Sequence, residues 1–124
     1  MTRVMIMAGG TGGHVMPALA VAEQLRECGV DVVWLGSRRG LETRLVPQAG
    51  FRLLQIRVAG LRQAGVLDRL LAPLRLLRAL AEALRLMLRE RPAAVLGLGG
   101  FAAGPGGVAA WLLRRPLCLH EQNA

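Results

Sequence analysis

Short apolar runs alternate with helix-length segments along the whole of this 124-residue chain. Strands that are joined through helices need right-handed crossovers, and such crossovers build a parallel sheet with helices on both faces. We therefore predict one α/β domain over residues 1–124, with a Rossmann-like, doubly wound parallel sheet. The expected strands are residues 3–7, 31–35, 51–58, 93–98 and 116–120, and the expected helices are residues 16–28, 41–48, 73–91 and 106–113.

The hexapeptide GGTGGH at residues 9–14 directly follows the first apolar run. Glycines let the backbone approach a ligand, and the N-terminus of the following helix offers free N–H groups with a partial positive charge. A dinucleotide site would need a glycine where this chain has Val15. The pattern therefore predicts a phosphate site rather than an NAD site, and a tight turn without a ligand is the alternative. The candidate ligand-binding residues are Gly10, Thr11, Gly12 and Gly13, with His14 at the end of the loop.

A second glycine-rich segment, GLGGFAAGPGG at residues 97–107, follows the fourth expected strand. In a doubly wound sheet the first and fourth strands are neighbours at the topological switch point, where ligands bind at the carboxyl ends. We expect the two glycine loops to face each other across one crevice and to hold a diphosphate. The candidates in this segment are Gly99, Gly100, Phe101 and Gly104.

Four polar residues follow the fifth expected strand, and they belong at the same carboxyl edge of the sheet. They supply hydrogen-bond donors, acceptors and a possible base, although an exposed loop or a helix cap is the alternative. These residues are His120, Glu121, Gln122 and Asn123.

The long helix carries a wide apolar arc and a narrow polar stripe, the arginine stripe, made of Arg75, Arg78, Glu82, Arg85 and Arg89. The apolar arc spans roughly 220°, about twice what a helix needs to cover a sheet. One half of the arc can pack on the sheet, and the arginines beside the other half suggest acidic lipid headgroups. We expect this helix to dock on the cytoplasmic face of a membrane, and burial against another domain or subunit is the alternative. The proposed membrane residues are Leu74, Arg75, Leu77, Arg78 and Arg85.

The charge and composition narrow the choice of partners. The net charge is +8, and all 16 basic residues are arginine, which favours anionic partners. The aromatic content of 3% leaves few side chains for stacking on bases, so we expect no nucleic acid. Cys28 and Cys118 show no metal-ligand spacing, and we expect both to be buried free thiols. The only aspartates, Asp31 and Asp68, form no DxD motif, so no metal and no cofactor are expected in this chain.

Five segments resemble the N-terminal, acceptor-binding domain of the MurG family within glycosyltransferase family 28. They occur in this chain in the same order as in that family. The resemblance covers essentially the whole chain, and its glycine loops and HEQN are highly specific. It implies the N-terminal half of a GT-B fold and a hexosyltransferase of peptidoglycan synthesis, peripheral on the bacterial inner membrane. The segments are GGTGGHVMPALAVAEQL, VVWLGS, VAGLR at 58–62, VLGLGGFAAGPGGVAAW and HEQN.

The implied reaction is inverting transfer of N-acetylglucosamine from UDP-GlcNAc to the MurNAc of undecaprenyl-diphosphoryl-MurNAc-pentapeptide, which converts lipid I to lipid II. The resemblance makes His14 the candidate base, and Glu121 the other candidate. It places residues 11–13 and Asn123 at the donor side of the cleft. Phe101 departs from the family, because many members have tyrosine there.

A further departure is that the chain ends one residue after HEQN. We therefore expect the family's C-terminal donor domain to be absent and this polypeptide alone to be inactive, as a fragment or a subunit. The alternative function is a non-catalytic subunit that binds membrane and acceptor and recruits a separate donor-binding chain. A dinucleotide-dependent oxidoreductase is disfavoured by Val15 and by the lack of an acidic residue after the second strand.

Overall fold

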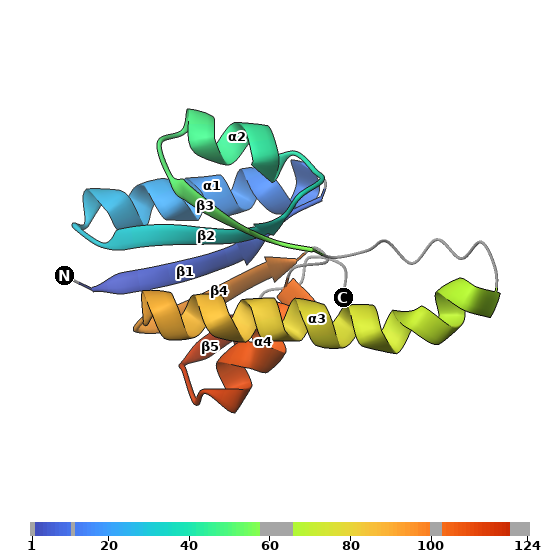
Figure 1. The fold of residues 1–124 in the computed structure, drawn as a ribbon. Coiled ribbons are helices and arrows are strands. Elements are labelled where there is room, and N and C mark those ends of the chain that lie inside the picture. The colour runs from blue at the N-terminus through green and yellow to red at the C-terminus, as the bar shows by residue number, and fades with distance from the viewer. Residues whose placement is uncertain (1, 11, 58–65, 100–102, 120–124) are drawn as a thin grey trace.

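The computed structural model describes residues 2–10, 12–57, 66–99 and 103–119. They form one parallel sheet in the order β3-β2-β1-β4-β5, with helices connecting the strands (Figure 1). β1 pairs with both β2 and β4, so the strand order reverses at β1, as predicted for a doubly wound sheet. The elements are β1 (Arg3–Ala8), α1 (Gly12–Glu27), β2 (Asp31–Ser37), α2 (Glu42–Gln48), β3 (Arg52–Ile56), α3 (Val66–Glu90), β4 (Ala94–Gly99), α4 (Ala103–Leu112) and β5 (Leu117–Leu119).

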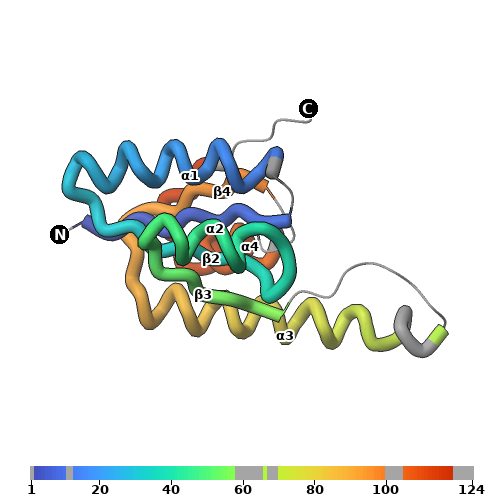
Figure 2. The backbone as a smooth tube through the Cα atoms, turned by 90° about the horizontal axis from the view of Figure 1, so that it is seen from above, coloured from blue at the N-terminus to red at the C-terminus, as the bar shows by residue number. Residues whose placement is uncertain are grey.

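Side chains from the two faces of the sheet form two separate apolar clusters. Successive residues of a strand point to opposite faces, so Met5 and Met7 contribute to one cluster while Ile6 and Ala8 contribute to the other. The first cluster includes residues of α3 and α4, and the second includes residues of α1 and α2. Figure 2 shows α1 and α3 on opposite sides of the sheet. The carboxyl ends of the central strands lie between these two layers of helices.

Three helices begin earlier than the sequence predicts. We expected the first helix at residue 16, the third at residue 73 and the fourth at residue 106, but the structure has Gly12, Val66 and Ala103 at these starts. A proline near an expected start suggested the first turn of a helix, since that position needs no N–H donor. Pro17 and Pro73 instead lie inside α1 and α3. The glycine loop therefore runs directly into the first turn of α1.

The two cysteines are free, as expected, but both are exposed. Our expectation of burial was wrong because of where each residue lies in the fold. Cys28 follows the last residue of α1 in a surface turn, and Cys118 lies in β5 at one end of the strand order. Neither position belongs to the apolar clusters.

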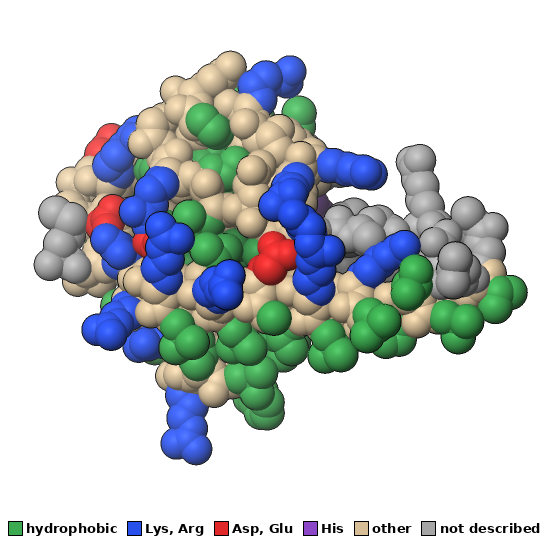
Figure 3. All heavy atoms as spheres, viewed as in Figure 1, with side chains coloured by type: hydrophobic (Ala, Val, Ile, Leu, Met, Phe, Trp, Pro, Cys, Tyr) green, Lys and Arg blue, Asp and Glu red, His purple; other side chains and the backbone are tan. Residues whose placement is uncertain are grey.

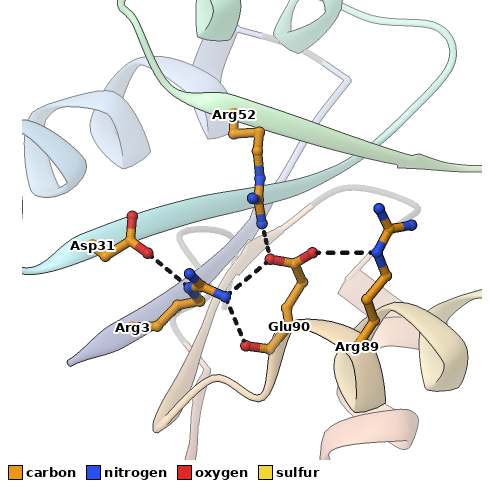
Figure 4. Close-up of polar contacts among 5 residues, drawn as sticks. All are labelled: Arg3, Asp31, Arg52, Arg89 and Glu90. Atoms are coloured by element: carbon orange, nitrogen blue, oxygen red, sulfur yellow. Dashed lines mark hydrogen bonds and ion pairs between the residues drawn. The ribbon is translucent and has the colours of Figure 1, made fainter. Parts of the chain in front are cut away.

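An ion-pair network joins the strands at their amino ends, opposite the edge predicted to bind ligands (Figure 4). Arg3 donates from Nε to Asp31 at 2.7 Å and from Nη1 to the backbone oxygen of Glu90 at 3.0 Å. The Glu90 carboxylate is buried and also contacts Arg52 and Arg89. The network fixes the end of α3 against β1, β2 and β3, so we assign it to stability.

Candidate functional site

The ends of β1 and β4 meet at the carboxyl edge of the sheet. Gly9 follows β1 directly, and its N–H donates to the carbonyl oxygen of Gly99 at 3.2 Å. Ala8 is in register with Gly99 after an irregularity in the β1–β4 pairing. The described parts of the two glycine segments are therefore in contact, as the predicted strand order requires, and a crevice between the loops that holds a diphosphate stays a prediction.

His14 lies in the first turn of α1 and reaches across to β4. Its Nδ1 is 3.2 Å from the carbonyl oxygen of Leu98. A carbonyl oxygen can only accept, so this contact places the hydrogen on Nδ1 and leaves Nε2 of the neutral ring without a proton. A side chain at Gly99 would collide with the imidazole, because an added Cβ would lie 2.3 Å from Nδ1. The imidazole is thus held against β4 with Nε2 as its unprotonated nitrogen.

The first turn of α1 supplies the backbone donors of this site. Gly12, Gly13 and His14 begin the helix, and the first N–H groups of a helix have no partner within it. The N–H of Gly10 has a different role, since it donates to Oε1 of Glu42 at 3.0 Å. Gly10 therefore shapes the loop, while the N–H groups that could face an anion come from the start of α1.

Glu42 is a buried carboxylate beneath the first glycine loop, and sequence reasoning missed it. The residue is 0% exposed. Its Oε2 accepts from the Ser37 N–H at 3.0 Å and lies 3.1 Å from the Ser37 hydroxyl. The glutamate thereby ties the loop after β2 to the loop after β1, because it also holds Gly10.

The space for Glu42 is made by glycines. An added Cβ would lie 2.1 Å from this side chain at Gly9, 2.7 Å at Gly36 and 2.3 Å at Gly40. The loop carbonyl of Gly10 also accepts from the Leu41 N–H at 3.2 Å. In the sequence, this arrangement is visible only as the pattern G-x₃-G-x-E over residues 36–42. The pattern alone does not indicate that the glutamate contacts Gly10.

Several predicted site residues lie outside the described part of the chain, and their roles stay predictions. Gly104 is described and lies in the first turn of α4. Among the described residues no group of three His, Cys, Asp or Glu side chains could hold a metal ion. The predicted residues outside the description are Thr11, Gly100, Phe101, His120, Glu121, Gln122 and Asn123.

α3 has three distinct faces. The first is buried on the sheet through Ala79, Ala83 and Met87. The second, about 100° around the helix, is the predicted arginine stripe, in which Arg78 contacts Glu82 at 3.6 Å. The third is apolar and exposed, roughly opposite the buried face (Figure 3). Arg78 and Arg85 line a groove toward β3, so they lie beside that apolar face rather than on it.

The exposed apolar face continues from α3 onto α4, which packs beside it. We define the apolar patch as Leu70, Leu74, Leu77, Val108 and Trp111, all exposed. Leu74 and Leu77 are 62% and 61% exposed, and Trp111 is 72% exposed. Contiguous patches of this kind mark interaction sites. No helix in the described ranges combines the length and hydropathy needed to cross a membrane.

Known proteins of similar sequence indicate which family this chain belongs to. A sequence profile described as the glycosyltransferase family 28 N-terminal domain matches residues 4–124. Proteins of Alkalilimnicola ehrlichii and Nitrosococcus oceani are 67% and 62% identical over 121 and 122 residues, each 98% of this chain and 34% of the relative. Both are named UDP-N-acetylglucosamine--N-acetylmuramyl-(pentapeptide) pyrophosphoryl-undecaprenol N-acetylglucosamine transferase.

A crystal structure gives the same picture at the level of the fold. MurG of Acinetobacter baumannii superposes with a TM-score of 0.87 at 48% identity, over 100% of this chain and 36% of that one. The predicted fold, a doubly wound sheet of the GT-B type, is confirmed. The chain spans about a third of the length of the curated relatives it matches.

Proposed function

Since this chain belongs to the family of glycosyltransferase 28 N-terminal domains, we propose that it supplies the acceptor-binding part of a transferase. The proposed reaction moves N-acetylglucosamine from UDP-GlcNAc to the MurNAc of undecaprenyl-diphosphoryl-MurNAc-pentapeptide, with inversion at the sugar. The names of the relatives support this choice of substrates. The donor nucleotide is held by a second domain outside these 124 residues.

The observation that carries the proposal is the contact between the His14 ring and Leu98. In the proposed step the attacking hydroxyl oxygen of MurNAc bonds to the anomeric carbon of GlcNAc while the bond to UDP breaks. The hydroxyl proton moves to Nε2 of His14, the nitrogen that the Leu98 contact leaves unprotonated. An imidazole suits this step because histidine is the side chain that most often serves as a general base. Glu121 remains the other candidate base.

The acceptor diphosphate is proposed to lie between the ends of β1 and β4. The free N–H groups at the start of α1, from Gly12 to His14, would donate to phosphate oxygens, and the positive end of the helix favours the charge. Glu42 supports this arrangement indirectly, because it fixes the loop that leads into the helix.

The apolar patch is proposed to dock on an anionic membrane at the cytoplasmic face of the inner membrane, where a lipid-linked acceptor is found. Leu74, Leu77 and Trp111 would enter the headgroup region, and Arg75, Arg78 and Arg85 would lie beside it near acidic headgroups. Helix–lipid contact of this kind needs no spanning segment.

The test compares acceptor binding with turnover. We expect the 124-residue chain to bind a lipid I analogue in detergent, measured by titration. In an enzyme completed with a donor domain, His14→Ala should lower kcat by about 10²- to 10⁴-fold while acceptor affinity stays nearly unchanged. A variant that keeps kcat within threefold of wild type would remove His14 from the role of base.

A further inference from the structure

An arginine-rich groove lies between the edge strand β3 and helix α3, outside the site built from the glycine loops. Its volume is about 610 Å³. Leu86 and Ala81 give it an apolar wall, and Gln55 of β3 also lines it. Five arginines line the same groove, namely Arg38, Arg57, Arg78, Arg85 and Arg89.

The groove has an excess of positive charge. Glu82 is its one lining carboxylate, so five guanidinium groups and one carboxylate leave a net charge of 5 − 1 = +4. The Glu82 carboxylate already has partners, since it accepts a hydrogen bond from the backbone N–H of Arg57 at 3.2 Å and contacts the Arg78 guanidinium at 3.6 Å. Within the described residues, the guanidinium groups of Arg38 and Arg85 have no carboxylate partner. Such a groove favours a ligand with more than one negative charge.

The groove begins at the same edge of the sheet as the glycine loops. Ser37 of β2 and Ile56 of β3 are in register, and Arg38 and Arg57 directly follow them. These two arginines therefore extend from neighbouring strand ends. β3 also ends the strand order, so among the described strands only β2 pairs with it. An open strand edge can hydrogen-bond an extended peptide along its backbone.

We propose that this groove binds the peptide of the acceptor through the peptide's carboxylates. The inference rests on the proposed function, which gives an acceptor carrying a pentapeptide. β1 and β3 are two strand spacings apart, about 10 Å. Five extended residues span up to about 17 Å, so a peptide whose sugar lies at the glycine loops reaches Arg38 and Arg57. A peptide carries a terminal carboxylate, which pairs with guanidinium groups in a forked geometry.

The apolar patch and the groove lie on different faces of α3. The patch residues Leu74 and Leu77 point about 100° away from the arginine stripe around the helix axis. A membrane that covers the patch leaves Arg38 and Arg57, which follow the ends of β2 and β3, on the sheet side of α3. We therefore assign the part of the groove at Arg38 and Arg57 to a peptide, and leave Arg78 and Arg85, beside the apolar patch, to the proposed lipid contact.

The test compares binding after changing the carboxylates of the ligand, the arginines of the groove, or both. Two acceptor analogues on a short soluble prenyl chain are titrated into the 124-residue chain, one with free peptide carboxylates and one with these groups amidated. Amidation should weaken binding to wild type about tenfold, and it should have little effect on the double variant Arg38→Gln/Arg57→Gln. The matched control is Arg91→Gln/Arg114→Gln, which removes two exposed arginines at the amino-terminal side of the sheet and should behave as wild type.

The outcomes separate this inference from the proposed function. If both analogues bind wild type equally well, the groove does not read carboxylates, while acceptor binding stands. If neither analogue binds, both the proposed function and this inference fail. Flotation with vesicles containing anionic phospholipid should be unchanged in Arg38→Gln/Arg57→Gln. Loss of flotation with an unchanged response to amidation would assign the groove to lipid and overturn the inference.

Discussion

Replacing Glu42 by alanine removes the buried side chain that joins the two loops beneath the glycine site. Its carboxylate accepts hydrogen bonds from the N–H groups of Gly10 and Ser37, each at 3.0 Å. Alanine leaves both donors without this acceptor and opens a cavity where a 0% exposed side chain had been. The fold and the glycine loop should therefore weaken together.

The size of the effect follows from the contacts. A buried donor that loses its acceptor costs about 1–3 kcal/mol; the Ser37 N–H is buried and the Gly10 N–H is partly buried, so we expect a loss of about 2–4 kcal/mol in the free energy of unfolding. Domains of this kind are stable by about 5–15 kcal/mol, so the substitution should remove a large part of the stability. Glu42→Gln keeps the volume and one carbonyl oxygen, but its amide group faces one of the two donors. We expect it to lose roughly half as much.

Urea unfolding followed by circular dichroism measures these differences in the 124-residue chain. The matched control is Glu23→Ala, which removes an exposed glutamate of α1 and should change stability by less than about 0.5 kcal/mol. We expect the order wild type, Glu42→Gln, Glu42→Ala from most to least stable. A Glu42→Ala variant as stable as the Glu23→Ala control would refute the reasoning that Glu42 holds the loops.

Three further predictions concern the loop, the core and the surface. Gly99 has φ of +111°, and an added Cβ would lie 2.3 Å from the His14 ring. Gly99→Ala should therefore lower the free energy of unfolding by about 1–3 kcal/mol and shift the ring signals of His14 in NMR. Unchanged ring signals would contradict this prediction. Gly106→Ala should destabilise the chain by about 1–3 kcal/mol, because its Cβ would collide with a buried methionine sulfur; an unchanged melting temperature would count against this packing. Leu77→Ser should reduce binding to anionic vesicles about tenfold. The control is Leu76→Ser, which changes an equally exposed leucine outside the apolar patch and should leave binding unchanged. Equal losses of binding would argue against docking through that patch.

The parts of the fold that follow local patterns could be predicted from the sequence. The alternation of apolar runs and helices determined a doubly wound sheet, and its strand order brought the two glycine segments together, as the contact of Gly9 with Gly99 confirms. Helix starts were less predictable. Pro17 and Pro73 resemble first-turn residues locally, yet both lie inside longer helices, α1 and α3.

Contacts between residues far apart in the sequence could not be predicted. Glu42 binds Gly10 from 32 residues away, and no periodicity or spacing marks that pair. The sequence placed His14 at the end of a glycine loop, but only the fold shows that the carbonyl oxygen of Leu98 selects its tautomer. The arginine stripe of α3 was correct in its spacing, while its position beside β3 depends on how the helix packs.

The central claim is that this chain is the acceptor-binding part of an N-acetylglucosamine transferase. Its most direct test is transfer of radiolabelled N-acetylglucosamine from UDP-GlcNAc to a lipid I analogue in detergent. The chain is assayed alone and then with a separately produced MurG C-terminal domain. We predict product only in the mixture, and transfer slower by about 10²- to 10⁴-fold when the chain in the mixture carries His14→Ala. Transfer by the chain alone, or equal transfer with and without His14, would contradict the account.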